Sequence, residues 1–103
     1  MSVFRVILEM DVAEDDAERF ERTWMHAASS FCDVPGVVSQ TLASEPNQPG
    51  KFTITSDWED DASFRAFETS PEQDAATAEL RRLRRSLFVR TQVVHGIVTR
   101  KAA

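Results

Sequence analysis

Hydrophobic and polar residues alternate along the first segment of the chain. In residues 3–11, every second residue from Phe4 to Met10 is apolar, whereas the opposite face mixes polar side chains with Ile7. A period of two residues is typical of a β-strand that buries one face. The pattern therefore predicts a strand over residues 3–11.

The period changes to three or four residues in the next segment, which predicts an amphipathic helix. Its apolar stripe consists of Ala17, Phe20, Trp24, Ala27 and Phe31. Acidic residues at 14–16 precede the stripe, where the positive end of the helix dipole favours negative charge. Pro35 and Gly36 then end the helix and predict a turn.

Two more strands are predicted in the middle of the chain. Residues 37–44 form the first, and residues 51–58 form the second. The segment EPNQPG at 45–50 connects them, because proline, asparagine and glycine favour turns. One face of the second strand carries Phe52, Ile54, Ser56 and Trp58.

The segment after Trp58 contains two helix starts. The first has acidic residues in its first turn, and the second has Ser70 as its cap, Pro71 at its first helical position and Gln73 three residues after the cap. We therefore predict a helix that is kinked or split near Ser70. Its second piece, residues 71–86, has a stripe of Ala76, Leu80, Leu83 and Leu87. The β-branched segment 88–98 predicts a last strand.

The resulting order, β-α-β-β-α-β, predicts an α+β fold of the ferredoxin-like type, with a single domain over residues 1–103. Such a fold has helices on one sheet face and leaves the other face open. We expect the open face to carry Ile7, Val93 and Ile97, and to be covered by a second copy of the chain. A homodimer is therefore predicted.

Charge and cysteine content narrow the classes of function. The 103 residues carry a net charge of −5, which argues against nucleic acid as the main partner. The basic segment RRLRR at 81–85 is the local exception: it either binds an anionic ligand or complements the end of a helix dipole.

The single cysteine, Cys32, excludes an internal disulfide and offers no metal-ligand spacing. The sequence contains no signal-peptide pattern and no apolar segment of membrane-spanning length, so we expect a cytoplasmic protein with no membrane partner.

Several segments together resemble the antibiotic biosynthesis monooxygenase family. They are FRVILEMDV, FERTW, FTITSDWEDDASFRAFETSPEQ and TQVVHGIV, and they cover nearly the whole chain. Within the family they most resemble the small anthrone-type oxygenases of aromatic polyketide pathways, such as those for tetracenomycin and actinorhodin. The most specific part is Ser-Asp-Trp at a strand end, followed by an acidic turn, Phe64, Phe67 and the Ser70–Pro71 pair.

The resemblance implies a dimeric α+β barrel with one pocket per subunit, between sheet and helices. It also implies that molecular oxygen oxidises a polycyclic phenol without flavin, haem or metal, so no cofactor is expected. The substrate loses a proton, its anion passes one electron to oxygen, and the radical pair recombines to a peroxide that loses water to give a quinone. Such chemistry requires an apolar pocket with aromatic walls and a few hydrogen-bonding groups.

Trp58 and His95 are the candidates for substrate positioning and proton transfer. A histidine with an ordinary pKa can accept a phenolic or benzylic proton near neutral pH. The alternatives are that Trp58 seals the core and that His95 lies at a dimer interface. The candidates for contact with the substrate are Trp24, Gln40, Phe52, Ile54, Phe64, Phe67, Arg90 and Gln92.

Some of these residues have a second interpretation. Trp24 belongs to the core stripe of its helix, Gln40 can lie on the surface, and Arg90 can pair with a surface acid. The chain also departs from the family pattern, because Glu72, Gln73 and Asp74 follow the Ser-Pro pair where many relatives have a histidine.

The haem-degrading branch of the family requires an axial histidine on the second helix. The aligned position here is Thr77, and Phe67 takes the place of a tryptophan ten residues earlier. The sequence therefore argues against haem degradation. Two other functions remain open: a cyclase that folds a poly-β-ketone without redox chemistry, and a protein that binds aromatic ligands without turnover. No motif of a standard nucleophilic or phosphate-binding site is present in the sequence.

Overall fold

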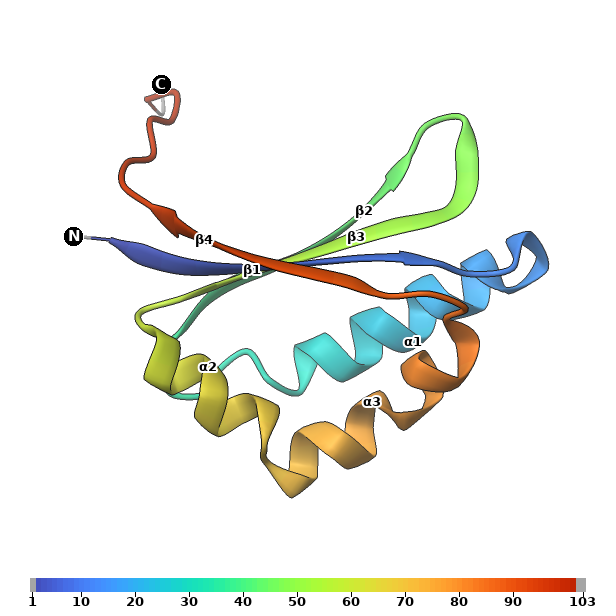
Figure 1. Ribbon diagram of the computed structural model, residues 1–103, viewed down its shortest axis with the longest axis horizontal. Coiled ribbons are helices and arrows are strands. Elements are labelled where there is room, and N and C mark those ends of the chain that lie inside the picture. The colour runs from blue at the N-terminus through green and yellow to red at the C-terminus, as the bar shows by residue number, and fades with distance from the viewer. Residues whose placement is uncertain (1, 102–103) are drawn as a thin grey trace.

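A four-stranded antiparallel sheet carries all the helices on one of its faces in the computed structural model, which describes residues 2–101 (Figure 1). The strands lie in the order β2-β3-β1-β4. The elements are β1 (Val3–Asp11), the 3-10 turn η1 (Glu14–Asp16), α1 (Ala17–Ser29), β2 (Val37–Glu45), β3 (Gln48–Trp58), α2 (Asp61–Glu68), α3 (Pro71–Leu83) and β4 (Phe88–Val94). This arrangement confirms the predicted α+β ferredoxin-like fold.

The register of the sheet decides which side chains face the helices. Phe4 of β1 lies opposite Trp58 of β3 and opposite Val93 of β4. Directly opposite residues of an antiparallel pair share a face, so these three side chains lie on one side of the sheet. Phe4 also contacts Phe64 of α2, with ring centroids 6.1 Å apart, which identifies that side as the face covered by helices.

The split second helix is confirmed, and the predicted helix stripe is confirmed except at Phe31, which lies beyond the end of α1. In α1, Ala17, Phe20, Trp24 and Ala27 are buried against the sheet. The backbone N–H of Ser63 donates to the Asp60 side chain at the start of α2. The N–H of Gln73 donates to Ser70 Oγ at 3.1 Å, so a new cap starts α3 two residues after α2 ends.

The structure corrects the bounds of the predicted connector and the end of the predicted second helix piece. β3 begins at Gln48, so the predicted connector over 45–50 shrinks to a turn at residues 46–47. Pro49 and Gly50 lie in an irregular part of β3, where Gly50 has a φ of +97° and its carbonyl accepts from Val12 N–H. α3 ends at Leu83, which leaves Leu87 outside the helix.

The last strand is also shorter than predicted. It ends at Val94 because its partner strand β1 begins at Val3, directly opposite Val94. Residues 95–98 therefore have no strand to pair with, and the chain leaves the sheet (Figure 1). The prediction of a strand over 88–98 was wrong at this end, and His95 is not a strand residue.

The open face of the sheet is more polar than predicted. Arg5 forms a bidentate ion pair with Asp57, in which Nε lies 2.7 Å from Oδ1 and Nη2 lies 2.9 Å from Oδ2. Arg90 Nη2 lies 3.6 Å from Glu9 Oε1. Ile7 does lie on this face, but it is only 6% exposed. Val93 was wrongly placed there, because the register sets it on the helix side of the sheet, where it is 54% exposed.

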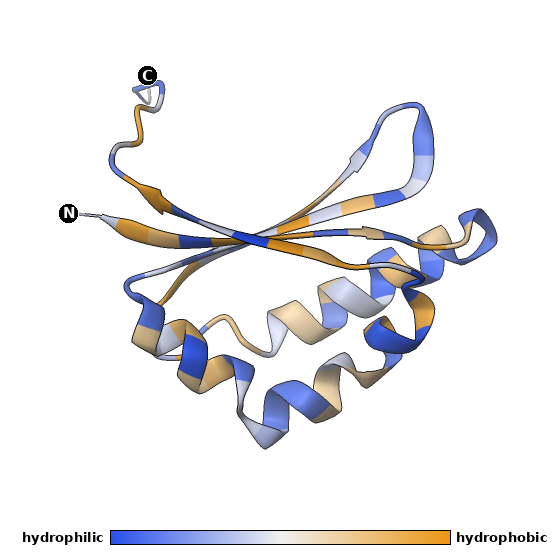
Figure 2. Ribbon diagram, viewed as in Figure 1, coloured by the Kyte–Doolittle hydropathy of each residue, from blue (hydrophilic) through white to orange (hydrophobic). Residues whose placement is uncertain are grey.

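The core lies between α1, α3 and the covered face of the sheet. Its buried residues are Met10, Val12, Ala17, Phe20, Trp24, Ala27, Phe52, Ile54, Leu80 and Leu83. Apolar positions also occur in β4 and in the segment after it, as Figure 2 shows by hydropathy. None of the helices within residues 2–101 is long and apolar enough to cross a membrane.

Candidate functional site

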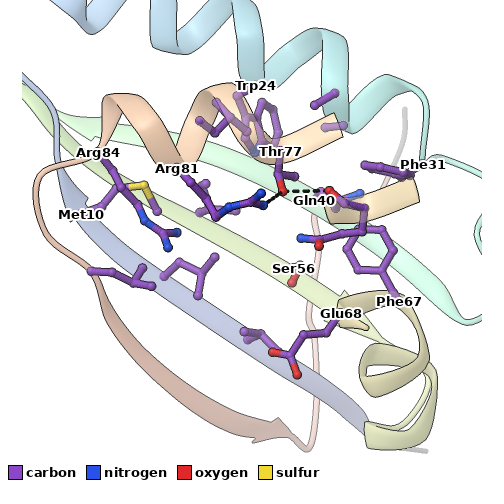
Figure 3. A pocket seen from close by; sticks show the side chains of 18 of the residues that line it. Met10, Trp24, Phe31, Gln40, Ser56, Phe67, Glu68, Thr77, Arg81 and Arg84 are labelled. Atoms are coloured by element: carbon purple, nitrogen blue, oxygen red, sulfur yellow. Dashed lines mark hydrogen bonds between the residues drawn. The ribbon is translucent and has the colours of Figure 1, made fainter. Parts of the chain in front are cut away.

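A cavity of about 300 Å³ lies between the covered face of the sheet and the helix layer (Figure 3). Small-molecule pockets in proteins span about 300–1,000 Å³, so this volume is at the lower end of that range. Leu87 and Val89 line the cavity and are 41% and 52% exposed, so the cavity reaches solvent beside β4. The core is therefore hollow where a ligand could enter.

The walls of the cavity are mostly apolar. β1 contributes Val6, Leu8 and Met10, and α1 contributes Trp24 among others. Phe31 and Phe67 line one end, edge to face, with ring centroids 4.9 Å apart. Aromatic rings in such arrangements offer flat, rigid surfaces against which a planar ligand can pack.

Trp58 supports this aromatic end from behind. It is fully buried, and its ring centroid lies 5.1 Å from that of Phe67 and 5.7 Å from that of Phe64. Trp58 is not among the residues that line the cavity. Its indole N–H donates to Ser56 Oγ at 3.0 Å, so this donor is already used within the protein.

Ser56 connects Trp58 to the cavity, because it accepts the hydrogen bond of the indole and itself lines the cavity. Ser56 is buried and lines the cavity, and it lies opposite Gln40 of β2, which lines it too. A serine hydroxyl has one donor and two acceptor positions. Because Ser56 Oγ accepts from Trp58, its own hydrogen remains available to donate, for example to a ligand oxygen.

The polar groups of α3 form a chain along the helix side of the cavity. Arg81 Nη1 donates to Thr77 Oγ1 at 2.6 Å, and Thr77 Oγ1 donates to the Gln73 carbonyl at 2.8 Å (Figure 3). Arg81 Nη2 also contacts the Asp74 carboxylate at 3.1 Å. The hydrogen-bonding groups of Arg81 and Thr77 are thus engaged within the helix.

The two ends of the cavity differ in charge. Arg84 and Arg81 lie at one end, whereas Glu68 lies towards the end that carries Phe67 (Figure 3). Partial burial, and then the nearby positive charge of Arg81, lower the pKa of Arg84 below its usual value. Glu68 is exposed and contacts Arg65 at 3.3 Å. The cavity is therefore electropositive at the end of α3.

The structure brings five of the eight predicted contact residues to the cavity. They are Trp24, Gln40, Ile54, Phe64 and Phe67. Phe52 lies in the core instead, where it stacks on Phe20 with centroids 4.8 Å apart.

Three candidates lie away from the cavity. Arg90 and Gln92 are exposed on the open face, opposite Ile7 and Arg5, so their side chains point away from the helices. His95 is exposed beyond the end of β4 and does not line the cavity. Within one chain, therefore, neither Arg90 nor Gln92 nor His95 reaches the site.

Several polar residues of the cavity were not among the predicted site residues. They are Ser56, Glu68, Gln73, Thr77, Arg81 and Arg84. Ser56 shares a strand face with Ile54 and Trp58, which was a usable signal for its inward position. The two arginines belong to the basic segment at 81–85, for which the sequence left ligand binding and dipole complementation open.

The described residues that line the cavity include no histidine, cysteine or tyrosine, which are common axial ligands of a haem iron. Thr77, at the position aligned with the axial histidine, is bonded to Gln73 and Arg81. Within residues 2–101, no group of three or more histidine, cysteine or acidic residues is placed to hold a metal ion.

Solved structures with the same fold come from several organisms. A protein from Chloroflexus aurantiacus, described as an antibiotic biosynthesis monooxygenase, is similar with a TM-score of 0.80 and 22% identity, over 94% of this chain and 97% of that one. SnoaB, a cofactor-independent oxygenase from Streptomyces nogalater, has a TM-score of 0.72 and 21% identity, over 95% of each chain. MhuD, a haem degrader from Mycobacterium tuberculosis solved with two haems in its active site, has a TM-score of 0.77 and 19% identity, over 93% of this chain and 99% of that one. At these identities the likeness establishes the fold.

The family itself is established by a match to a sequence model. No curated protein is significantly similar to the chain. The model described as antibiotic biosynthesis monooxygenase matches residues 3–79, which include β1 to β3, α1, α2 and most of α3. These elements build most of the sheet face and of the helix layer around the cavity. The chain therefore belongs to the antibiotic biosynthesis monooxygenase family.

Proposed function

We propose that the protein is a cofactor-independent monooxygenase that oxidises an anthrone-type aromatic polyketide to a quinone with molecular oxygen. The observation that carries the proposal is the hollow, aromatic-walled core of a family member whose fold is shared by the oxygenase SnoaB. An apolar cavity can bind a planar ring system and dioxygen together, and it limits the access of water to the reactive intermediates.

The overall reaction adds one oxygen atom to the substrate and releases one water. The methylene carbon of the anthrone first loses a proton to give a delocalised anion. One electron passes from this anion to oxygen, and the resulting radical pair forms a carbon–oxygen bond. The peroxide then loses water as its O–O and remaining C–H bonds break, which leaves a carbonyl group. The substrate supplies the electrons in this scheme.

The side chains of the cavity have distinct roles in this proposal. Phe31 and Phe67 pack against the rings, while Gln40 and the Ser56 hydroxyl bind ring oxygens and stabilise charge on them. Trp58 is a positioning residue, because its indole N–H fixes the Ser56 hydroxyl. Glu68 is the carboxylate that lines the cavity, so we assign it the role of proton acceptor in place of His95.

A comparison of aerobic and anaerobic reactions tests the proposal. Dithranol, a hydroxylated anthrone, would be incubated with the protein, with heat-denatured protein and with buffer. We expect quinone to form faster with folded protein in air, to incorporate one atom from labelled dioxygen, and to require oxygen. Loss of water from a poly-β-ketone at an unchanged oxidation level would instead identify a cyclase. A rise in melting temperature with an aromatic ligand, without turnover, would identify a binding protein.

The proposal includes a homodimer that forms along β4. This strand is at the edge of the sheet, and apolar side chains on both of its faces are exposed, including Phe88 at 61% and Val93 at 54%. An exposed apolar edge strand favours pairing with another chain. A second copy there would also cover the opening of the cavity beside Leu87 and Val89.

Sedimentation measurements test this assembly. We expect about twice the 11.6 kDa mass of one chain for the wild-type protein, and a monomer for Val93→Asp. A matched change on the open face, Thr53→Asp, should leave the dimer intact. A monomeric wild-type protein would reject the dimer without affecting the proposed chemistry.

A further inference from the structure

Arg84 differs from the other arginine at its end of the cavity in having no side-chain partner among residues 2–101. Arg81 is held by Thr77 and by the carboxylate of Asp74. The guanidinium of Arg84 forms no ion pair and no hydrogen bond with any residue within 2–101. Its position at the cavity wall is seen in Figure 3.

The backbone of Arg84 is firmly anchored. Its N–H donates to the Leu80 carbonyl at 3.1 Å, and it forms an isolated bridge with Val12. The next residue, Arg85, donates its N–H to the Asp11 carbonyl at 2.7 Å. The chain is thus tied to the end of α3 on one side and to β1 on the other, so the side chain of Arg84 leaves from a fixed point.

The surroundings of Arg84 favour an anion. Met10 lies beside Arg84 at this end of the cavity (Figure 3), and Leu87 and Val89, which follow Arg84 in the chain, also line the cavity; all three are apolar. A cation that is partly removed from water and lies near a second arginine is unfavourable until an opposite charge approaches it. A guanidinium group presents two parallel N–H donors, which match the two oxygens of a carboxylate.

We propose that the cavity selects aromatic ligands that carry a carboxylate, and that Arg84 binds this carboxylate. The inference rests on the proposed function, since it assumes that the ring system occupies the apolar part of the same cavity. Glu68 lies towards the other end and repels a carboxylate there. The acid group therefore sets the direction in which the rings enter: the carboxylate lies at Arg84, and the rings extend towards Phe31 and Phe67.

A pair of ligands that differ only in charge tests the assignment. Anthraquinone-2-carboxylate and 2-(hydroxymethyl)anthraquinone have the same ring system, and their binding would be measured by calorimetry and by quenching of tryptophan fluorescence. We expect the wild-type protein to bind the carboxylate at least about tenfold more tightly than the alcohol, as charge-assisted hydrogen bonds require. The preference should disappear as the pH falls below the pKa of the ligand's carboxyl group.

The variants separate Arg84 from the general positive charge of the segment. Arg84→Gln should abolish the preference and retain binding of the alcohol. Arg85→Gln is the matched control, because Arg85 is exposed and does not line the cavity, and it should retain the preference. Arg84→Lys should give an intermediate preference, since lysine keeps the charge without the two parallel donors. Circular dichroism and melting temperature would establish that each variant is folded.

The outcomes distinguish this inference from the proposed function. Equal binding of both ligands by the wild-type protein would overturn the role of Arg84 and leave the cavity proposal standing. Equal loss of the preference in Arg84→Gln and Arg85→Gln would also overturn it, because the general positive charge of the segment 81–85 would then explain the preference. If neither ligand binds, the ligand class on which both proposals depend is wrong.

Discussion

The two faces of the sheet use the same strands in different ways. On the open face, Arg5 and Asp57 neutralise each other at 2.7 Å, and Arg90 lies near Glu9. On the covered face, the strands contribute Val6, Gln40, Ile54 and Ser56 to a cavity that the helices leave partly unfilled. The open face thus satisfies its own polar groups, whereas the covered face keeps hydrogen-bonding groups directed at an internal space. Unfilled space and unused donors are features of a binding site rather than of an efficient core.

The largest expected effect comes from removing the support behind the aromatic wall. Trp58→Ala should lower the free energy of unfolding by about 3–5 kcal/mol, because it creates a large gap beneath Phe64 and Phe67. Urea denaturation measures this loss. A loss below about 1 kcal/mol would show that Trp58 does not support the cavity wall.

A pair of neighbouring residues on β3 compares the two faces directly. Ser56→Ala leaves the buried indole N–H of Trp58 without its acceptor, which should cost about 1–3 kcal/mol. It should also slow quinone formation, because the cavity loses a hydroxyl donor. Thr55→Val changes the adjacent residue on the open face and should alter stability by no more than about 0.5 kcal/mol. Similar results for the two variants would remove the distinction between the faces.

A change confined to the open face should alter stability and leave the site intact. Asp57→Asn removes the charge that Arg5 pairs with, and we expect a loss of about 1–2 kcal/mol, since Asp57 as a whole residue is only 5% exposed. Binding of an aromatic ligand should stay within a factor of about two, because the side chain points away from the cavity. A large fall in affinity would mean that the faces are coupled.

The sequence predicted the fold well, because the elements that define it have strong local signals. The apolar stripe of α1, the caps at Asp60 and Ser70, and the alternation in β1 each specify local structure without reference to distant residues. The end of β4 lacked such a signal. It is set by the pairing of Val94 with Val3, the first residue of β1, and this contact joins residues near the two ends of the chain.

The site was predicted only in part, for a similar reason. β4 has apolar residues on both faces, such as Phe88 and Val89, so its sequence did not show which side faces the helices. Arg90 and Gln92 were therefore predicted as site residues, whereas the register places them on the side of the sheet away from the cavity. The position of Arg84 depends on its bridge to Val12, which brings together residues more than seventy positions apart in a way that helix periodicity does not predict.

The most direct test of the central claim, that the cavity holds the ring system while it reacts with oxygen, is to fill the cavity and measure turnover. Ala28 of α1 lines the cavity, and Ala28→Phe would occupy part of its volume. The control is Gln92→Ala on the open face. Initial rates of oxygen-dependent quinone formation from dithranol would be compared between folded variants. We predict a fall of at least about tenfold for Ala28→Phe and an unchanged rate for Gln92→Ala; equal rates for wild type and Ala28→Phe would contradict the account.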